Sequence, residues 1–205
     1  MITTTRTERT FCGQPQYSVS PSQTSSYRPP AALPAAPPTF VAIDFETADY
    51  GRDSACALAL VRVEAGVIVQ RAFHYIRPPR ARMIFTYLHG ISWEQVAGAP
   101  VFAQLWPQLQ PLLAGAAFLA AHNASFDRAV MRACCAAAGL AQPAHAFACT
   151  VRLARAAWQL RPARLPDVCR HLGIPLQHHA AASDAEACAR IVLAAAAAGQ
   201  RLPQP

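Results

Sequence analysis

The acidic residues that could do chemistry in this chain are few and fall into groups. The 205 residues include only 11 acidic side chains. Asp44 and Glu46 stand two positions apart at the end of an apolar run, so on a strand both project to the same side. Two carboxylates this close repel each other and raise each other's pKa unless a cation lies between them. Taken alone, the pair could equally be a solvated strand end.

Two further groups lie where helices are expected to begin. Asp127 ends the run AHNASFD, and Asp184 follows the adjacent residues His178 and His179. Each carboxylate alone could simply offset the dipole of its helix. Neutral histidine is also a metal ligand, but carboxylate oxygens around it favour Mg²⁺ or Mn²⁺ over zinc.

Hydrophobic periodicity indicates the elements that must position these groups. Strands are expected at residues 40–45, 55–62, 67–76, 116–121 and 147–150, and helices at 92–97, 101–114, 125–138, 151–159, 165–172 and 183–198. Asn123 or Ser125 is expected to cap the helix at 125, and Ser183 the last helix. Three strands followed by helices that alternate with short strands predict a single α/β domain, with a mixed central sheet flanked by helices.

Residues 1–38 have a different composition, dense in Thr, Ser, Gln and Pro. Such a segment cannot bury enough apolar surface to offset the entropy of ordering it. The sequence therefore predicts a disordered tail over 1–38 and one folded domain over 39–205.

Net charge indicates what kind of partner the protein binds, and cysteine content indicates the redox state of its compartment. The formal net charge is +7, and all 18 basic side chains are arginine, whose planar fork suits phosphate. This favours a polyanionic partner such as nucleic acid, although arginine-rich codon usage explains the bias equally well. Seven cysteines without a CxxC pair indicate reduced thiols and a cytoplasmic protein. No apolar run approaches the ~20 residues that cross a membrane, so no membrane partner is expected.

Together the three groups resemble the motifs of the DEDDh exonucleases, the superfamily of ribonuclease T and the DNA polymerase III epsilon subunit. Asp44 and Glu46 match its D-x-E motif, residues 122–127 match H-N-x-x-F-D, and His179 with Asp184 matches H-x(4)-D. Segments 89–92 (HGIS) and 149–155 (CTVRLAR) also look like this family. The doubled histidine is a departure; His179 is chosen because it stands five residues before Asp184.

The resemblance implies a ribonuclease H-like fold and a metal-dependent 3′→5′ exonuclease that releases nucleoside 5′-monophosphates. Two Mg²⁺ (or Mn²⁺) ions would be held by four carboxylates, and His179 would take a proton from the attacking water. The metal ligands would be Asp44, Glu46, Asp127 and Asp184. Substrate contacts are expected from Phe45, Thr47, His122, Asn123 and Phe126, although core packing is an equal alternative for the two phenylalanines.

The motifs leave the polymer and the physiological context open. Single-stranded 3′ ends of DNA are the expected substrate, as in the epsilon-like branch, with a DNA polymerase as a candidate partner. An enzyme like ribonuclease T or oligoribonuclease, acting on RNA ends, would carry the same metal centre. A nucleic-acid-binding or polymerase-accessory module that has lost catalysis is the alternative from another class, but all five catalytic positions are filled.

Overall fold

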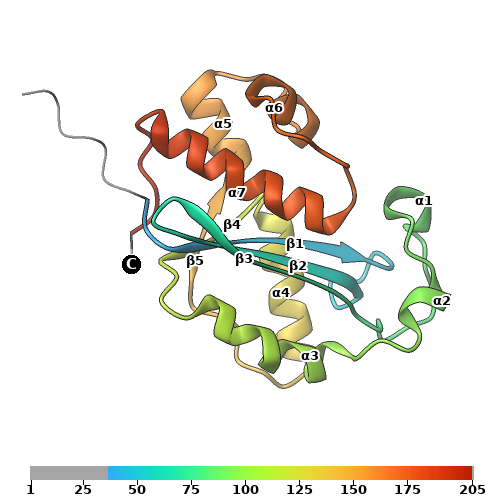
Figure 1. Ribbon diagram of the computed structural model, residues 1–205. Helices are drawn as coiled ribbons and strands as arrows, with labels where there is room; N and C mark the ends of the chain where they lie inside the picture. The colour runs from blue at the N-terminus through green and yellow to red at the C-terminus, as the bar shows by residue number, and fades with distance from the viewer. Residues whose placement is uncertain (1–36, 205) are drawn as a thin grey trace, which may run out of the picture. The chain divides into compact units, whose positions relative to one another are not determined.

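The central strand of the protein is the β-branched and aromatic run that precedes the first acidic pair. In the computed structural model, which describes residues 37–204, this run forms β1 (Phe40–Thr47), in the middle of a five-stranded sheet. The order is β3-β2-β1-β4-β5, with β2 (Ala55–Glu64) and β3 (Val67–Tyr75) antiparallel and β4 (Phe118–Ala121) and β5 (Ala146–Cys149) parallel (Figure 1). The predicted mixed sheet is therefore confirmed, whereas the predicted tail lies almost wholly outside the described residues.

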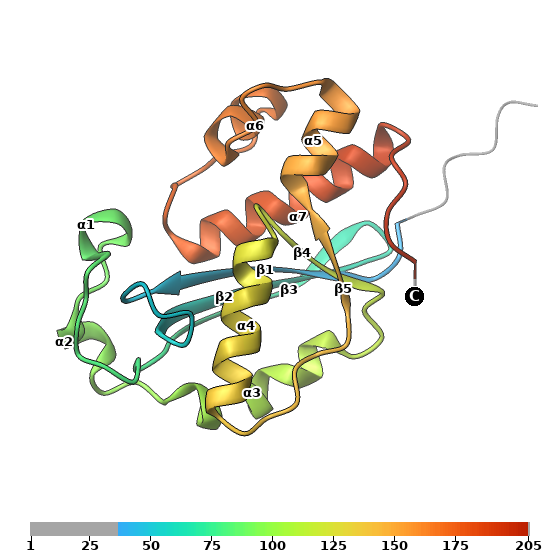
Figure 2. The same cartoon turned by 180° about the vertical axis from the view of Figure 1, so that it is seen from behind.

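Helices cover both faces of this sheet. α7 (Ala181–Ala197) lies across one face, with α5 (Thr150–Trp158) and α6 (Leu165–Leu172) beyond it, and α3 (Phe102–Leu109) and α4 (Ser125–Ala137) cover the other (Figures 1 and 2). No helix in the described part of the chain is long and apolar enough to cross a membrane.

Alternation along β1 decides which residues meet which helices. Phe40 and Ala42 pack with α7, whereas Val41, Ile43 and Phe45 pack in the core under α3 and α4. By the same period of two, Asp44 and Glu46 face α7. The residues of α7 that meet the sheet are small, chiefly alanine, so the helix can lie close to the strand ends.

The parallel pairing of β1 and β4 brings two of the motifs to one edge of the sheet. Ala42 lies opposite Ala120, so both strands direct their carboxyl ends to the same edge. That edge carries Asp44 and Glu46 from β1 and the 122–127 segment that follows β4. Crevices at the carboxyl ends of strands are where open α/β sheets bind ligands.

Several local predictions need correction. α7 begins at Ala181, ahead of the expected cap Ser183, whose hydroxyl instead accepts a hydrogen bond from the Gln177 amide. Neither Asn123 nor Ser125 caps α4: the N-cap is Ala124, and Asn123 adopts a left-handed conformation with φ 62°. The short helix α1 (Thr86–His89) was not predicted; α2 (Trp93–Val96) was, and a 3₁₀ turn (Gln110–Leu113) continues α3.

Candidate active site

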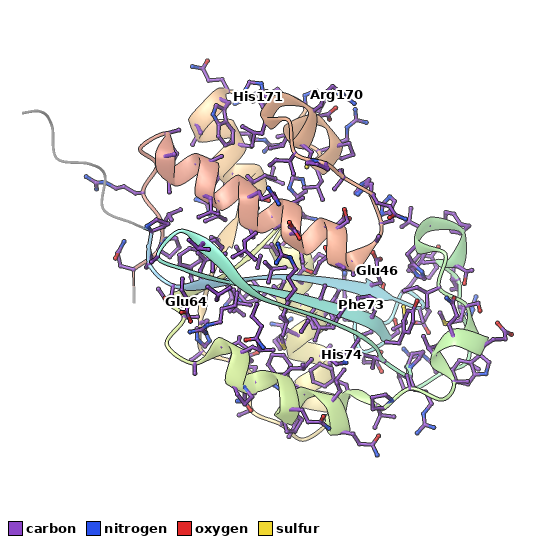
Figure 3. All side chains as sticks on the ribbon, viewed as in Figure 1. Glu46, Glu64, Phe73, His74, Arg170 and His171 are labelled. Atoms are coloured by element: carbon purple, nitrogen blue, oxygen red, sulfur yellow. The ribbon has the colours of Figure 1, made fainter. Side chains whose placement is uncertain are left out.

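Three of the predicted metal ligands meet at the carboxyl end of β1. Asp44, Glu46 and Asp184 each present a carboxylate oxygen, and these oxygens all lie within 4.8 Å of one another. Glu46 is 9% exposed and Asp184 4%, so both belong to the interior wall of the site. Figure 3 places the Glu46 side chain between the end of β1 and the start of α7. The structure thus brings together two residues of one strand and a helix start about 140 positions later in the sequence.

Asp127 approaches the same strand from the other side, on the first turn of α4. It is 2% exposed, and its Oδ1 accepts a hydrogen bond of 3.1 Å from the amide of Phe45. It is not one of the three carboxylates that converge within 4.8 Å. Its negative charge nevertheless raises the pKa of both Asp44 and Glu46, so it lies near enough to share their electrostatic environment.

Burial and mutual repulsion raise the pKa values of these carboxylates above their ordinary range. Burial raises the pKa of Glu46 to about 8, with the charges of Asp184 and Asp127 adding to the shift. Burial likewise raises the pKa of Asp127 to about 7, against the hydrogen bond from Phe45 that lowers it. The pKa of Asp44 is raised well above its usual range by burial and then by the charges of Asp127, Glu46 and Asp184. Such a group ionises fully at neutral pH only when positive charge is added.

One buried carboxylate oxygen of the cluster is a candidate metal ligand. Oδ1 of Asp184 is buried and has no hydrogen-bond partner among the residues that the structure describes. An unpaired buried carboxylate oxygen is costly, and hard oxygen donors are what Mg²⁺ and Mn²⁺ prefer. The donor set and this unsatisfied atom therefore fit a divalent cation.

The adjacent histidines both touch Asp184, but through different groups. The His178 ring donates from Nδ1 to Oδ2 of Asp184 at 3.0 Å, and the same oxygen accepts the backbone amide of His179 at 3.1 Å. The two rings stack with centroids 3.8 Å apart. His179 has φ 67°, a conformation that non-glycine residues rarely adopt. Burial and the neighbouring His178 lower the pKa of His179, so its ring stays neutral at neutral pH. Both histidines line the site, and the choice of His179 as base stays a prediction.

A cleft of about 990 Å³ contains every residue predicted for the site. Among the predicted substrate contacts, Phe45 is only 2% exposed and its ring belongs to the core, which favours the packing alternative for that side chain. Phe126 is half-buried, and the Arg52 guanidinium lies 4.8 Å above its ring. Thr47 is 7% exposed, whereas Asn123 is open to solvent.

Two other histidines of the cleft are engaged with the protein itself. Nδ1 of His122 lies 2.8 Å from the Thr150 hydroxyl, and burial lowers the pKa of His122 to about 4. Nδ1 of His89 accepts the Ile91 amide at 3.0 Å, which leaves Nε2 to donate to the Thr47 carbonyl at 3.2 Å. His89 thereby braces the end of β1 rather than offering a free nitrogen to a ligand.

Sequence reasoning missed the arginines of the cleft wall. Arg155 on α5, Arg170 on α6 and Arg164 just before α6 all line the cleft, with Phe85 and Leu88 at the α1 side. Arg164 and Arg170 share one acidic partner, Asp167. The excess of arginine indicated that a basic surface exists. Its position could not be predicted from the spacing of the arginines, because these residues come together only through the fold of α5, α6 and the segment that connects them.

Comparison with known families identifies the chain. The model of the family described as Exonuclease (RNase_T) matches residues 41–192, which include all three motifs. The chain belongs to this exonuclease family. The resemblance inferred from the motifs, to the DEDDh exonucleases, is thereby confirmed.

The curated relatives of this exonuclease are much longer than the chain. It is 35% identical over 154 residues to a DNA polymerase III PolC-type from Oceanobacillus iheyensis, a match that covers 73% of this chain and 11% of the relative. The chain thus spans about a ninth of that relative's length.

Solved structures carry the same fold. Exonuclease X in complex with 5′-overhanging duplex DNA is similar with a TM-score of 0.66 and 25% identity, covering 80% of this chain and 95% of that one. The nuclease domain of 3′hExo, a DEDDh family member bound to rAMP, gives a TM-score of 0.65 and 19% identity over 76% and 90% of the two chains. The predicted ribonuclease H-like fold class is therefore confirmed.

Proposed function

We propose that this exonuclease hydrolyses the 3′-terminal phosphodiester of a single-stranded nucleic acid and releases nucleoside 5′-monophosphates. The observation that carries the proposal is the convergence of carboxylate oxygens of Asp44, Glu46 and Asp184 within 4.8 Å, with Oδ1 of Asp184 unpaired among residues 37–204. Asp127 lines the same cleft, and its negative charge contributes to the raised pKa of Glu46. These four carboxylates would hold two divalent ions, Mg²⁺ or Mn²⁺. When bound, the ions supply the positive charge that offsets the carboxylates and the charge developing on the phosphate.

The protein's own groups would position and deprotonate the water. We assign the base to His179 because its ring nitrogens make no hydrogen bond to another described residue, whereas Nδ1 of His178 is held by Asp184. A neutral imidazole can take the proton of the attacking water at a free ring nitrogen. His178 would fix the orientation of the Asp184 carboxylate through its hydrogen bond to Oδ2, so that Oδ1 stays directed toward the metal site.

The walls of the cleft would supply contacts for a nucleic acid strand. Arg155, Arg164 and Arg170 provide guanidinium groups that suit phosphate, on the wall formed by α5 and α6. Asn123 and Phe126 stand beside Asp127 and would contact the terminal nucleotide. Thr47 and His122 would shape the pocket, with the His122 ring fixed by Thr150.

DNA is the favoured polymer, because the matched relatives are DNA polymerases, and a polymerase is accordingly the candidate partner. Cytoplasmic location also stays a proposal; the six cysteines among the described residues are all free, as reduced thiols would be. The ribonuclease T-like alternative predicts that short RNA is the better substrate. The inactive-module alternative predicts binding without hydrolysis.

A substrate panel distinguishes these functions. Purified full-length protein would be given single-stranded DNA, duplex DNA and short RNA, each labelled at the 5′ end to reveal stepwise shortening, with Mg²⁺ or with a chelator. We expect Mg²⁺-dependent ladders that are strongest on single-stranded DNA, and nucleoside 5′-monophosphates as products. Asp44→Asn should abolish them, whereas Glu64→Gln, a surface change in an ion pair with Arg62, should not. Binding without any shortening of DNA or RNA would refute the enzyme proposal.

A further inference from the structure

The β1–β2 loop (residues 48–54) continues the strand that carries the first acidic pair, and it lies between α1 and α4 (Figure 2). The ring of Tyr50 meets the ring of Phe85 edge-on, with centroids 5.0 Å apart. The guanidinium of Arg52 lies 4.8 Å above the ring of Phe126, the geometry of a cation–π contact. Phe85 and Phe126 both line the cleft. The loop therefore contacts the wall of the cleft at α1 and again at α4.

An arginine from another part of the chain holds this loop. Arg80, which follows β3, donates four hydrogen bonds of 2.7 to 3.1 Å to the carboxylates of Asp49 and Asp53. A single exposed ion pair contributes little, but one planar guanidinium that binds two carboxylates fixes their relative positions. Ser54 is fully buried, and its hydroxyl accepts the amide of Asp49 at 3.1 Å. Both ends of the loop are thereby fixed.

Gly51 allows Arg80 to approach the loop this closely. A Cβ atom at position 51 would overlap with Nη2 of Arg80 and would lie 2.6 Å from Oδ1 of Asp53. A larger residue would therefore push the guanidinium and the carboxylates apart. These are the ends of flexible side chains, so such a change would loosen the loop without disturbing the core.

The loop carries one positive charge that no carboxylate offsets. Asp49 and Asp53 are both paired with Arg80, whereas Arg52 is exposed and forms no ion pair with any residue between positions 37 and 204. A free guanidinium beside an aromatic side chain of the cleft suits the phosphate of a nucleic acid. Packing against Phe126 alone does not explain why a second arginine fixes the loop that carries Arg52.

We propose that the β1–β2 loop is a second nucleic-acid subsite, in which Arg52 binds a phosphate of the strand that leads into the cleft. Arg80 is a positioning residue, because its guanidinium is occupied by Asp49 and Asp53 and it acts on the strand only through Arg52. Without Arg80, the two freed carboxylates compete with the phosphate for the guanidinium of Arg52. The inference rests on the proposed function, since it adds a contact to the same nucleic acid substrate.

Binding without hydrolysis tests this subsite. Full-length protein in chelator would be titrated into labelled single-stranded DNA and RNA of one sequence, and fluorescence anisotropy would be followed over a series of salt concentrations. One lost phosphate contact on a single strand lowers the slope of log affinity against log salt by about 0.7. We expect that loss in Arg52→Gln and also in Arg80→Gln. Gly51→Ala should show it too, although this variant keeps every charge of the protein.

Combining the two substitutions separates a positioning role from a direct contact. Residues that act through one another are not additive, so Arg52→Gln/Arg80→Gln should lower the slope no further than Arg52→Gln alone. Arg82→Gln is the matched control, since Arg82 is exposed and has no acidic partner in the described part of the chain. It should leave the slope unchanged.

Four results would overturn the proposal. An unchanged slope in Arg52→Gln would remove the phosphate contact, and an equal loss in Arg82→Gln would reduce the effect to net charge. A lower melting temperature with an unchanged slope in Arg80→Gln would leave that residue a purely structural role. A double variant that loses two contacts would show that Arg80 binds phosphate by itself.

Hydrolysis of the same oligonucleotides with Mg²⁺ provides the second arm. KM should rise several-fold in Arg52→Gln and Arg80→Gln with kcat little changed, because the metal ligands lie in the cleft and not in the loop. A fall in kcat as large as the rise in KM would contradict a subsite that only binds. If the wild-type protein shortens neither polymer, the proposed exonuclease function fails, and the anisotropy experiment still decides whether the loop binds nucleic acid.

Discussion

The amide of Phe45 donates a 3.1 Å hydrogen bond to Oδ1 of Asp127, across 82 residues of sequence. Because alternation turns the Phe45 ring into the core, the same residue anchors β1 by its side chain and fixes an acidic group of the cleft by its backbone. The bond joins the end of β1 to the first turn of α4, and thereby ties the first motif to the second.

Asp127→Asn separates the geometry of this bond from its charge. The amide oxygen can still accept from Phe45, while the negative charge is lost. We expect the rate of nucleotide release to fall roughly 100-fold or more, because metal-assisted charge stabilisation is worth several kcal/mol. The melting temperature of the metal-free protein should not fall, since a buried charge has been removed. Asp167→Asn is the control, because Asp167 lines the cleft but pairs with arginines. A near-wild-type rate in Asp127→Asn would show that this charge is dispensable.

The sequence was informative wherever a short-range pattern decides the structure. The period of two predicted that Asp44 and Glu46 project to the same side of β1, and the structure brings their carboxylate oxygens within 4.8 Å of each other. The turns into α4 and α7 put Asp127 and Asp184 at helix starts, as predicted.

What the sequence left unpredicted depends on long-range packing. α1 has only four residues and an N-cap, Phe85, without a capping side chain, so no local signal marked it. Ser183 looked like a cap, but its hydroxyl is taken by Gln177 from the preceding loop. The position of the cleft arginines, Arg155, Arg164 and Arg170, likewise depends on how α5 and α6 pack beside the cleft.

Metal-free protein should lose stability as pH rises across the neutral range. The folded-state pKa of Glu46 is about 8, above its ordinary value of 4.5, so between these values the folded protein binds more protons than the unfolded chain. The stability that this group contributes is fully present below pH 4.5 and is lost as pH rises through 8. Melting temperatures in chelator should therefore decline over this window, and Glu46→Gln should decline less, by roughly 3 °C or more at pH 8. Adding Mg²⁺ should flatten the wild-type curve. A melting temperature that rises with pH would contradict the shifted carboxylate.

His179→Ala should reduce turnover without removing metal binding. Loss of a general base costs about 10²- to 10⁴-fold in rate. The Asp184 carboxylate would keep its hydrogen bond from the backbone amide of residue 179, so Mg²⁺ should still raise the melting temperature. His178→Ala is the neighbouring comparison, and we expect the smaller loss there, because that ring orients Asp184 rather than the water. If His178→Ala is the more damaging change, the two roles are exchanged.

Arg155→Ala should weaken the binding of nucleic acid more than it slows the chemical step. Arg155 lines the cleft, is exposed, and has no acidic partner among residues 37–204, so its guanidinium is free for a phosphate. We expect KM for a single-stranded oligonucleotide to rise several-fold with kcat little changed, and the slope of log affinity against log salt to fall by about 0.7 for one lost phosphate contact on a single strand. Arg152→Ala is the matched control: it is exposed on the same helix but outside the cleft. If both variants raise KM equally, the effect reflects net charge. A salt slope unchanged in Arg155→Ala would remove this residue from the phosphate path.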